Sequence, residues 1–221
     1  MPSNRKIVFA NGEYYHLFNR GVERRLVFTN KREFLRAVDL VNFYRFDKPP
    51  LRYSKFLALS EELKPNFLAS LDEKIVEVIA FCLMGNHFHF LVKQVRDNGI
   101  SKFMANFMNS YTKYFNTKYQ RVGPLFQGAF KAVHIESDEQ LLHLSRYIHL
   151  NPVSSFMVKS DQLKDYQWSS YPDYTGIADV NFVDSRPVMN FFKKPINYEE
   201  FVLDQADYAK KLKAIEHLII D

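Results

Sequence analysis

The sequence predicts an α+β fold in which strands and helices alternate along one chain. A β-branched, apolar run over residues 75–84 is followed by Gly85-Asn86 and then by a second strand-like run, which is typical of an antiparallel hairpin. From residue 99 to about 119, apolar side chains recur at helical intervals. Because such strands and helices interleave, hairpins included, we expect an α+β sandwich.

The N-terminal half predicts a strand, a helix and a long connection. Residues 13–21 are rich in aromatic side chains and end at Gly21, which favours a strand followed by a turn. Asn30 and Glu33 form a capping-box pattern that opens a helix, and Pro49-Pro50 ends it. The apolar positions expected on this helix are Phe34, Leu35, Val38, Val41 and Phe46. We interpret residues 47–72 as a surface excursion with a short helical piece near 60–63.

The C-terminal half predicts a core helix, a further strand and a second capped helix. The stripe on the helix over 99–119 is expected in the core, and residues 129–136 form a strand after a turn-rich connection. Ser137 and Gln140 repeat the capping-box pattern. The helix that they open is expected to stop near Asn151, because Pro152 follows.

Composition narrows the class of protein. The 221 residues suit one domain with room for an appended subdomain, and the net charge of +5 with 30 basic against 25 acidic residues leans towards a polyanionic partner. A single cysteine, Cys82, excludes an internal disulfide and a multi-cysteine zinc cluster. The apolar stretch after the first residues is too short for a signal peptide, and no run approaches the roughly 20 apolar residues that cross a bilayer. We therefore expect a cytoplasmic protein with no membrane partner.

Two histidines stand two residues apart in the second strand of the predicted hairpin. Side chains at i and i+2 of a strand point the same way, so His87 and His89 converge, while Phe88 and Phe90 face the core. Imidazole suits Zn, Cu, Fe or Ni, and it also serves Mn or Mg when oxygen ligands complete the shell. The alternative is that two histidines share a solvated strand face by chance.

A second polar row lies on the helix that begins at Asp138. His143, Tyr147 and Asn151 follow one another at intervals of four, so Tyr147 and Asn151 can point into one site. A phenol is a poor nucleophile near neutral pH, and it needs a phosphate that is already polarised by a metal. The alternative is that Tyr147 covers the edge of the core and Asn151 only ends the helix.

These motifs together resemble those of a known enzyme family. Met84–Val92, with its two histidines, and Arg146–Val153, with Tyr147 and Asn151, look like the signature of single-tyrosine transposases of the HUH endonuclease superfamily, in particular the REP-associated tyrosine transposases. Smaller pieces agree in order and spacing over residues 13–175: Asn19-Arg20-Gly21, Tyr114-Phe115-Asn116, residues 123–128 and residues 168–171.

The resemblance implies a fold and a chemistry. The fold would be a ferredoxin-like or RRM-like antiparallel sheet with helices packed against it. His87, His89 and Asn151 would bind Mg or Mn, and Tyr147 would attack a phosphodiester of single-stranded or hairpin DNA. The product would be a 5′-phosphotyrosine link with a free 3′-hydroxyl that can later rejoin the strands. The resemblance leaves open the choice between Mg and Mn, the DNA target, and whether cleavage involves a homodimer.

Other candidate residues and other functions remain open beside the transposase interpretation. Arg20, Lys131 and Arg146 are candidate phosphate contacts, whereas Ala129 stands where the family commonly has Arg and Phe126 where it often has Trp. Further candidates are Tyr111, Tyr114 and Tyr119 as alternative nucleophiles and His134 as a ligand or base, with His16 and His217 taken as structural or solvated. The rival functions are a catalytically silent nucleic-acid-binding regulator and a metal-dependent hydrolase that uses water.

The resemblance also divides the chain. Residues 1–175 would form the single-tyrosine transposase-like catalytic domain. Residues 176–221 would be a C-terminal extension of unknown role, with a helical pattern from Tyr198 to Ile220.

Overall fold

A four-stranded antiparallel sheet forms the centre of the computed structural model, which describes residues 7–178, 180 and 182–211. The strands are β1 (Tyr14–Arg20), β2 (Val76–Met84), β3 (His87–Gln94) and β4 (Lys131–Ile135), in the order β2-β3-β1-β4. Helix α1 (Lys31–Tyr44) lies between β1 and β2 in sequence, and α4 (Gly99–Lys118) lies between β3 and β4. This β-α-β-β-α-β order is the ferredoxin-like arrangement, so the predicted fold class is confirmed.

The hairpin of β2 and β3 sets the sheet's register. Met84 pairs with His87 across the two-residue turn Gly85-Asn86, and Phe18 of β1 pairs with His89 on the other side of β3. The Gly85 carbonyl accepts hydrogen bonds from the backbone N–H groups of residues 27 and 28, at 2.8 and 3.0 Å. The segment before α1 is thereby attached to the turn.

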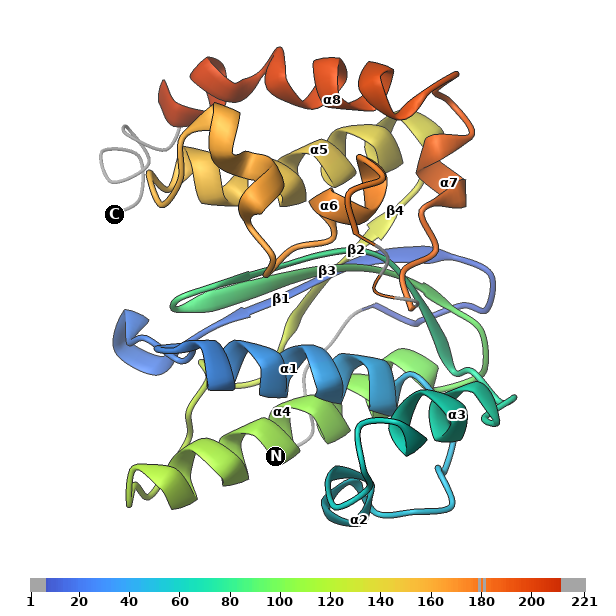
Figure 1. The fold of residues 1–221 in the computed structure, drawn as a ribbon, viewed down its shortest axis with the longest axis vertical. Coiled ribbons are helices and arrows are strands. Elements are labelled where there is room, and N and C mark those ends of the chain that lie inside the picture. Colours follow the sequence, from blue (N-terminus) through green and yellow to red (C-terminus); the bar gives the residue numbers. More distant parts are fainter. Residues whose placement is uncertain (1–6, 179, 181, 212–221) are drawn as a thin grey trace.

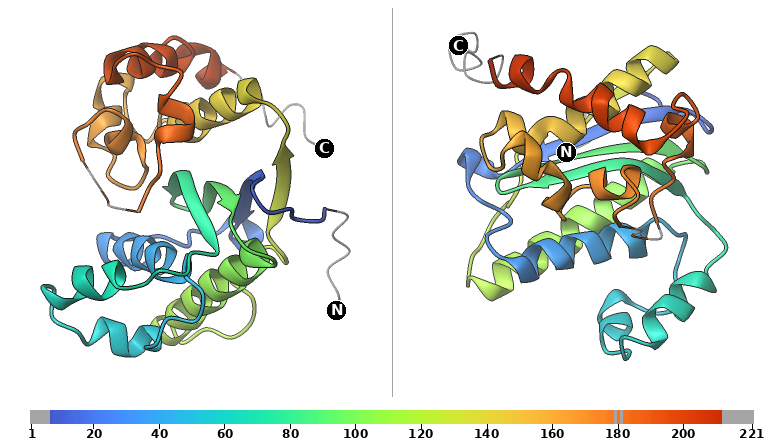
Figure 2. Two further views of the ribbon diagram at one scale, coloured as in Figure 1. Left: turned by 90° about the vertical axis from the view of Figure 1, so that its right-hand side faces the viewer. Right: turned by 45° about the horizontal axis from the view of Figure 1, so that its top comes forward.

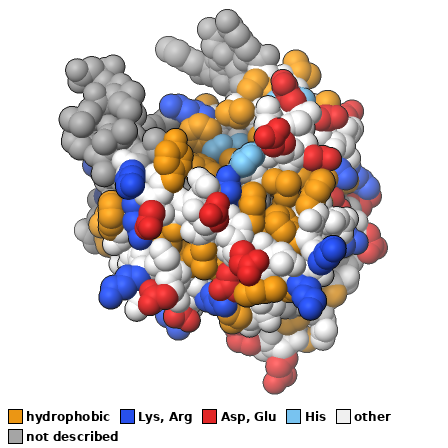
Figure 3. Space-filling view, turned by 90° about the horizontal axis from the view of Figure 1, so that it is seen from above, with side chains coloured by type: hydrophobic (Ala, Val, Ile, Leu, Met, Phe, Trp, Pro, Cys, Tyr) orange, Lys and Arg blue, Asp and Glu red, His pale blue; other side chains and the backbone are white. Residues whose placement is uncertain are grey.

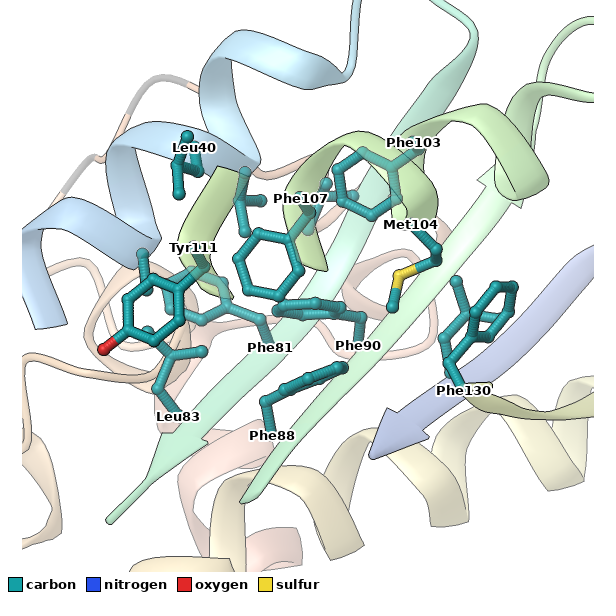
Figure 4. Packing of buried hydrophobic residues seen from close by; sticks show 14 of the residues in the cluster. Leu40, Phe81, Leu83, Phe88, Phe90, Phe103, Met104, Phe107, Tyr111 and Phe130 are labelled. Atoms are coloured by element: carbon teal, nitrogen blue, oxygen red, sulfur yellow. The ribbon is translucent and has the colours of Figure 1, made fainter. Parts of the chain in front are cut away.

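Helices α1 and α4 cover one face of the sheet and enclose a core rich in aromatic rings (Figures 1 and 4). The Phe107 ring meets both Phe88 and Phe90 edge-on, at 5.3 Å between centroids. The predicted stripe of α4 is buried except for Tyr114, which is partly buried; the buried residues are Ile100, Phe103, Met104, Phe107, Tyr111 and Phe115. Helix α1 starts at its expected cap but ends at Tyr44, so the prediction that it continues to the prolines is wrong, and Phe46 is buried outside it.

The predicted surface excursion contains two short helices, α2 (Tyr53–Leu57) and α3 (Leu63–Ala69), which project beside α1 and α4 (Figure 2). The helix expected near 60–63 was therefore misplaced. Tyr53 and Phe56 are buried, with ring centroids 5.1 Å from that of Phe43. These two rings explain why α2 forms, since they add to the core at the end of α1.

A second layer of helices covers the opposite face of the sheet (Figures 1 and 2). It comprises α5 (Asp138–Ser154), α6 (Tyr171–Tyr174), α7 (Arg186–Met189), α8 (Pro195–Leu203) and the short 3-10 helix η2 (Ser160–Asp165). A second 3-10 helix, η1 (Val22–Arg24), is separate from this layer in sequence and follows β1. Tyr198 of α8 is fully buried against this layer, so the described residues beyond 175 pack onto α5. Residues 212–220 of the predicted C-terminal helical pattern lie outside the described residues. None of the described helices combines the length and apolar character needed to cross a membrane.

Helix α5 does not stop near Asn151 as predicted but continues through Pro152 to Ser154. A proline beyond the first turn of a helix removes one backbone donor and crowds the carbonyl four residues earlier. Here the Asn151 carbonyl accepts from the Ser155 N–H at 3.0 Å, and Pro152 and Val153 are buried. Packing of the last turn therefore outweighs the break that the sequence favours.

Candidate functional site

A small pocket of about 210 Å³ lies where β1, β3 and β4 meet α5. Its walls combine the sheet's polar face, one residue of the turn before β4 and one side chain of the helix. The lining residues are Phe18, Asn19, Arg20, His87, Phe88, His89, Gln127, Lys131 and Tyr147. The sequence-predicted histidines, tyrosine and two of the three predicted cations thus share one pocket.

His87 and His89 lie side by side on β3, as their spacing predicts. Their ring centroids are 5.1 Å apart and the rings are nearly perpendicular, and both side chains are buried. Phe88 points to the other face and packs on Phe107 in the core. The alternation of a packing face and a polar face along β3 is confirmed, and the alternative of a solvated strand face is wrong.

The Nδ1 atom of each histidine has a polar neighbour. Nδ1 of His87 lies 2.5 Å from Oδ1 of Asn86, and Nδ1 of His89 lies 2.9 Å from Nε2 of His16 on β1. Burial lowers the pKa of His16 to about 4, so this ring is neutral near pH 7. Hydrogen bonds of this kind fix the tautomer and the orientation of an imidazole.

His16 is therefore a site residue that the sequence reading missed, having taken it as structural or solvated. It is two residues from Phe18 on β1, and Phe18 pairs directly with His89. The alternation within β1 would have placed His16 on the polar face of the sheet. What the sequence lacked was the register between β1 and β3.

Tyr147 reaches the same pocket from α5. Its ring meets that of His89 edge-on at 5.4 Å and that of His16 at 6.2 Å, and half of the residue's surface is exposed (50%). The alternative nucleophiles Tyr111 and Tyr114 are on α4, which packs on the other face of the sheet, and Tyr119 directly follows this helix. Among them, Tyr111 is buried and donates to the Val27 carbonyl. Of the tyrosines considered from the sequence, Tyr147 alone lines this pocket.

Asn151 lies one turn beyond Tyr147 but does not line the pocket. It is buried, and its carboxamide nitrogen donates to the Tyr147 backbone carbonyl at 2.9 Å. This bond ties the orientation of the Asn151 amide to the turn that carries Tyr147. Its carboxamide oxygen is the atom with the chemistry of a ligand for a hard cation.

The predicted phosphate contacts divide into two groups. Arg20 and Lys131 line the pocket, but the Arg146 guanidinium lies 4.3 Å over the Phe201 ring and donates to the Phe201 carbonyl. Arg146 therefore joins α5 to α8.

The candidate His134 is also outside the pocket and lies 2.9 Å from a carboxylate oxygen of Glu13. His217 lies outside the described residues.

The donor set suits a cation only if oxygen ligands join the imidazoles. Within the described part of the chain, no group of three or more His, Cys, Asp or Glu side chains has a geometry that could hold a metal ion. Two imidazoles with a carboxamide oxygen and water remain a chemically suitable set for a divalent ion.

Comparisons with known proteins agree with the motifs. Residues 52–151 match the family model described as IS200-like transposase. The fold is similar to a solved structure described as a REP-associated tyrosine transposase bound to a REP hairpin, with a TM-score of 0.51 and 15% sequence identity over 83% of this chain and 98% of that one. No curated protein matches the sequence. The family match confirms the resemblance to single-strand transposases over residues 52–151, and the structural similarity confirms the fold.

Proposed function

Because residues 52–151 match the IS200-like transposases, we propose that this chain nicks and rejoins single-stranded DNA with Tyr147 as the nucleophile. The observation that supports this most directly is the position of Tyr147. A half-exposed phenol stands against His89 in a pocket that also holds His87 and two cations. A tyrosine that only covered the edge of the core would not need this polar surrounding.

In the proposed reaction, the Tyr147 oxygen attacks a DNA phosphorus as the bond to the 3′-oxygen breaks. The phenol loses its proton, and the leaving 3′-oxygen takes one up. This gives a 5′-phosphotyrosine and a free 3′-hydroxyl, and attack by a 3′-hydroxyl on the phosphotyrosine reverses the step. Because one phosphoester replaces another, rejoining needs no external energy source. Arg20 and Lys131 line the same pocket, and in this proposal they neutralise phosphate charge beside the reacting group.

We further propose that His87, His89 and the Asn151 oxygen hold a divalent ion, Mg²⁺ or Mn²⁺. When bound, such an ion polarises the phosphate and lowers the barrier to attack by a weak nucleophile. With Nδ1 of both imidazoles facing Asn86 and His16, the ligating atoms would be the Nε2 atoms. His16 then acts as a positioning residue for His89, since a neutral His16 can accept the His89 Nδ1 proton.

The test is formation of a covalent adduct. The purified chain is incubated with end-labelled single-stranded hairpin DNA pools and Mn²⁺, and the products are separated on a denaturing gel. We expect a protein–DNA band that disappears in Tyr147→Phe. Tyr208→Phe is the matched control, because Tyr208 is similarly exposed (59%) and does not line the pocket.

Two other outcomes would refute the proposal. Native-gel binding without a covalent band would favour the catalytically silent regulator. Cleaved DNA that is never attached to the protein would favour a hydrolase that uses water.

A further inference from the structure

A second and larger cavity lies on the opposite face of the sheet from the tyrosine pocket. Its volume is about 870 Å³, and its walls come from α1, the connection 49–52, α2 and α4. The tyrosine pocket and α5 lie on the other side (Figure 1). Ligand pockets have typical volumes of roughly 300–1,000 Å³, so this cavity has room for a whole small ligand.

The cavity wall is basic and carries no carboxylate. Its cations are Arg32, Arg36, Arg52, Lys113 and Lys118, and no Asp or Glu is among the lining residues. Lys118 already forms an ion pair with buried Glu33 at 2.6 Å, so it is not counted among the cations available to a ligand. The other four form no ion pair with any residue in the described part of the chain. By contrast, basic and acidic side chains are interspersed on the α8 side of the molecule (Figure 3).

Three hydrogen-bond donors in this wall lack partners among the described residues. They are Nε of Arg36 and the hydroxyls of Tyr53 and Tyr114, all of them buried atoms. The Arg36 guanidinium lies over both tyrosine rings, 4.5 and 4.9 Å from their centroids, so the three groups form one cluster. A buried polar group without a partner is destabilising, and such groups in native proteins call for an explanation.

All three groups can donate a hydrogen bond. The Asp39 carboxylate is close enough to Arg36 and Tyr53 to act on both through its charge, but the lining residues themselves are basic, which favours an anionic acceptor as the partner. A phosphoryl group has the charge and the oxygens to satisfy them after a small rearrangement of the side chains. The cavity also presents Tyr44, Pro50 and Leu51, which offer apolar and aromatic surface to an uncharged part of the ligand. A nucleotide combines both parts.

We propose that this cavity binds a phosphorylated nucleotide, with its phosphate against Arg36 and the neighbouring cations. The nucleotide could be free or could be the end of a DNA or RNA strand, since both present the same phosphate and base. The proposal does not depend on Tyr147 or on a metal.

The test is binding of three probes by the full chain in the presence of a chelator: ATP, a 5′-phosphorylated dT10 and inorganic phosphate, measured by calorimetry. Arg52→Gln and Lys113→Gln alter exposed side chains, so their folding should be preserved, and Arg36→Gln removes the central cation. Lys55→Gln is the matched control, because Lys55 is an exposed cation on α2 that does not line the cavity.

We expect ATP or dT10 to bind, with about tenfold weaker affinity in each of the three cavity variants and no change in Lys55→Gln. Binding of ATP alone would identify a free nucleotide, and binding of dT10 alone would identify a strand end. The proposal is overturned if neither nucleotide probe binds, or if inorganic phosphate binds as tightly as ATP and dT10 do. It is also overturned if the cavity variants bind the nucleotide probes with the affinity of the wild type. Arg20→Gln tests the tyrosine pocket separately, so loss of binding only in that variant would also overturn it.

Discussion

The ion pair of Glu33 allows a quantitative prediction about acid stability. This carboxylate is buried in the first turn of α1 and accepts hydrogen bonds from Lys118 Nζ and Tyr119 Oη, each at 2.6 Å, and from the Thr29 backbone N–H at 2.7 Å. Burial raises the pKa of Glu33, but these hydrogen bonds outweigh burial and lower it to about 2.

The shift has a definite sign and size. The unfolded chain, with an ordinary pKa of 4.5, binds a proton at a higher pH than the folded chain does. The contribution of Glu33 to the free energy of unfolding is therefore complete above pH 4.5 and is lost as the pH falls towards 2. The shift corresponds to about 3 kcal/mol. We expect about 2 kcal/mol in practice, because the Lys118 end of the pair is open to solvent screening.

The assay is urea unfolding of the wild type and Glu33→Gln at a series of pH values from 7 to 2. Glu33→Gln should be less stable at pH 7, and the difference in unfolding free energy should shrink by about 2 kcal/mol between pH 4.5 and 2. Glu23→Gln is the control, since Glu23 forms an exposed pair with Arg25 that should contribute little. A difference between Glu33→Gln and wild type that stays constant over this range would refute the reasoning.

Three further predictions concern the cap of α1, the core and the positioning of His89. Asn30→Ala removes the side-chain acceptor for the Glu33 N–H and should cost about 1 kcal/mol in unfolding free energy, whereas Asn30→Gly should cost only a few tenths; chemical unfolding compares the two. Phe107→Ala empties the centre of a fully buried aromatic cluster and should cost about 3–5 kcal/mol, so a loss below 1 kcal/mol by urea unfolding would contradict the packing. His16→Ala should weaken Mn²⁺ binding about 10–100-fold by calorimetry, with partial rescue in His16→Gln; equal affinities in all three proteins would exclude a positioning role.

Local patterns predicted most of the fold because each strand and helix near the sheet follows its own periodicity. The turn Gly85-Asn86, the cap at Asn30 and the stripe of α4 act over a few residues, and all three appear in the structure. The errors arose where distant packing decides the outcome. Tyr53 is buried by contact with Phe43, and α5 continues through Pro152 because the sheet covers its last turn.

The candidate site was predictable to the extent that it lies within single elements. The spacing of His87 and His89 on one strand places both rings on one face, whatever the rest of the chain does. The partnership of His16 with His89 and the entry of Gln127 into the pocket depend on the register of β1 and on the connection before β4. The position of Arg146 depends on α8, which the motifs do not describe.

The sheet also explains how one small fold could separate two tasks. Successive side chains of a strand point to opposite faces, so the β3 residues that place imidazoles beside Tyr147 also place Phe88 and Phe90 against α4. Helix α4 in turn carries Tyr114 and Lys113 to the basic cavity on its outer side. A substitution in the shared aromatic core should therefore disturb both pockets together. A substitution of Tyr147 should affect only the tyrosine pocket, and one of Lys113 only the basic cavity, because these side chains lie on opposite sides of that core.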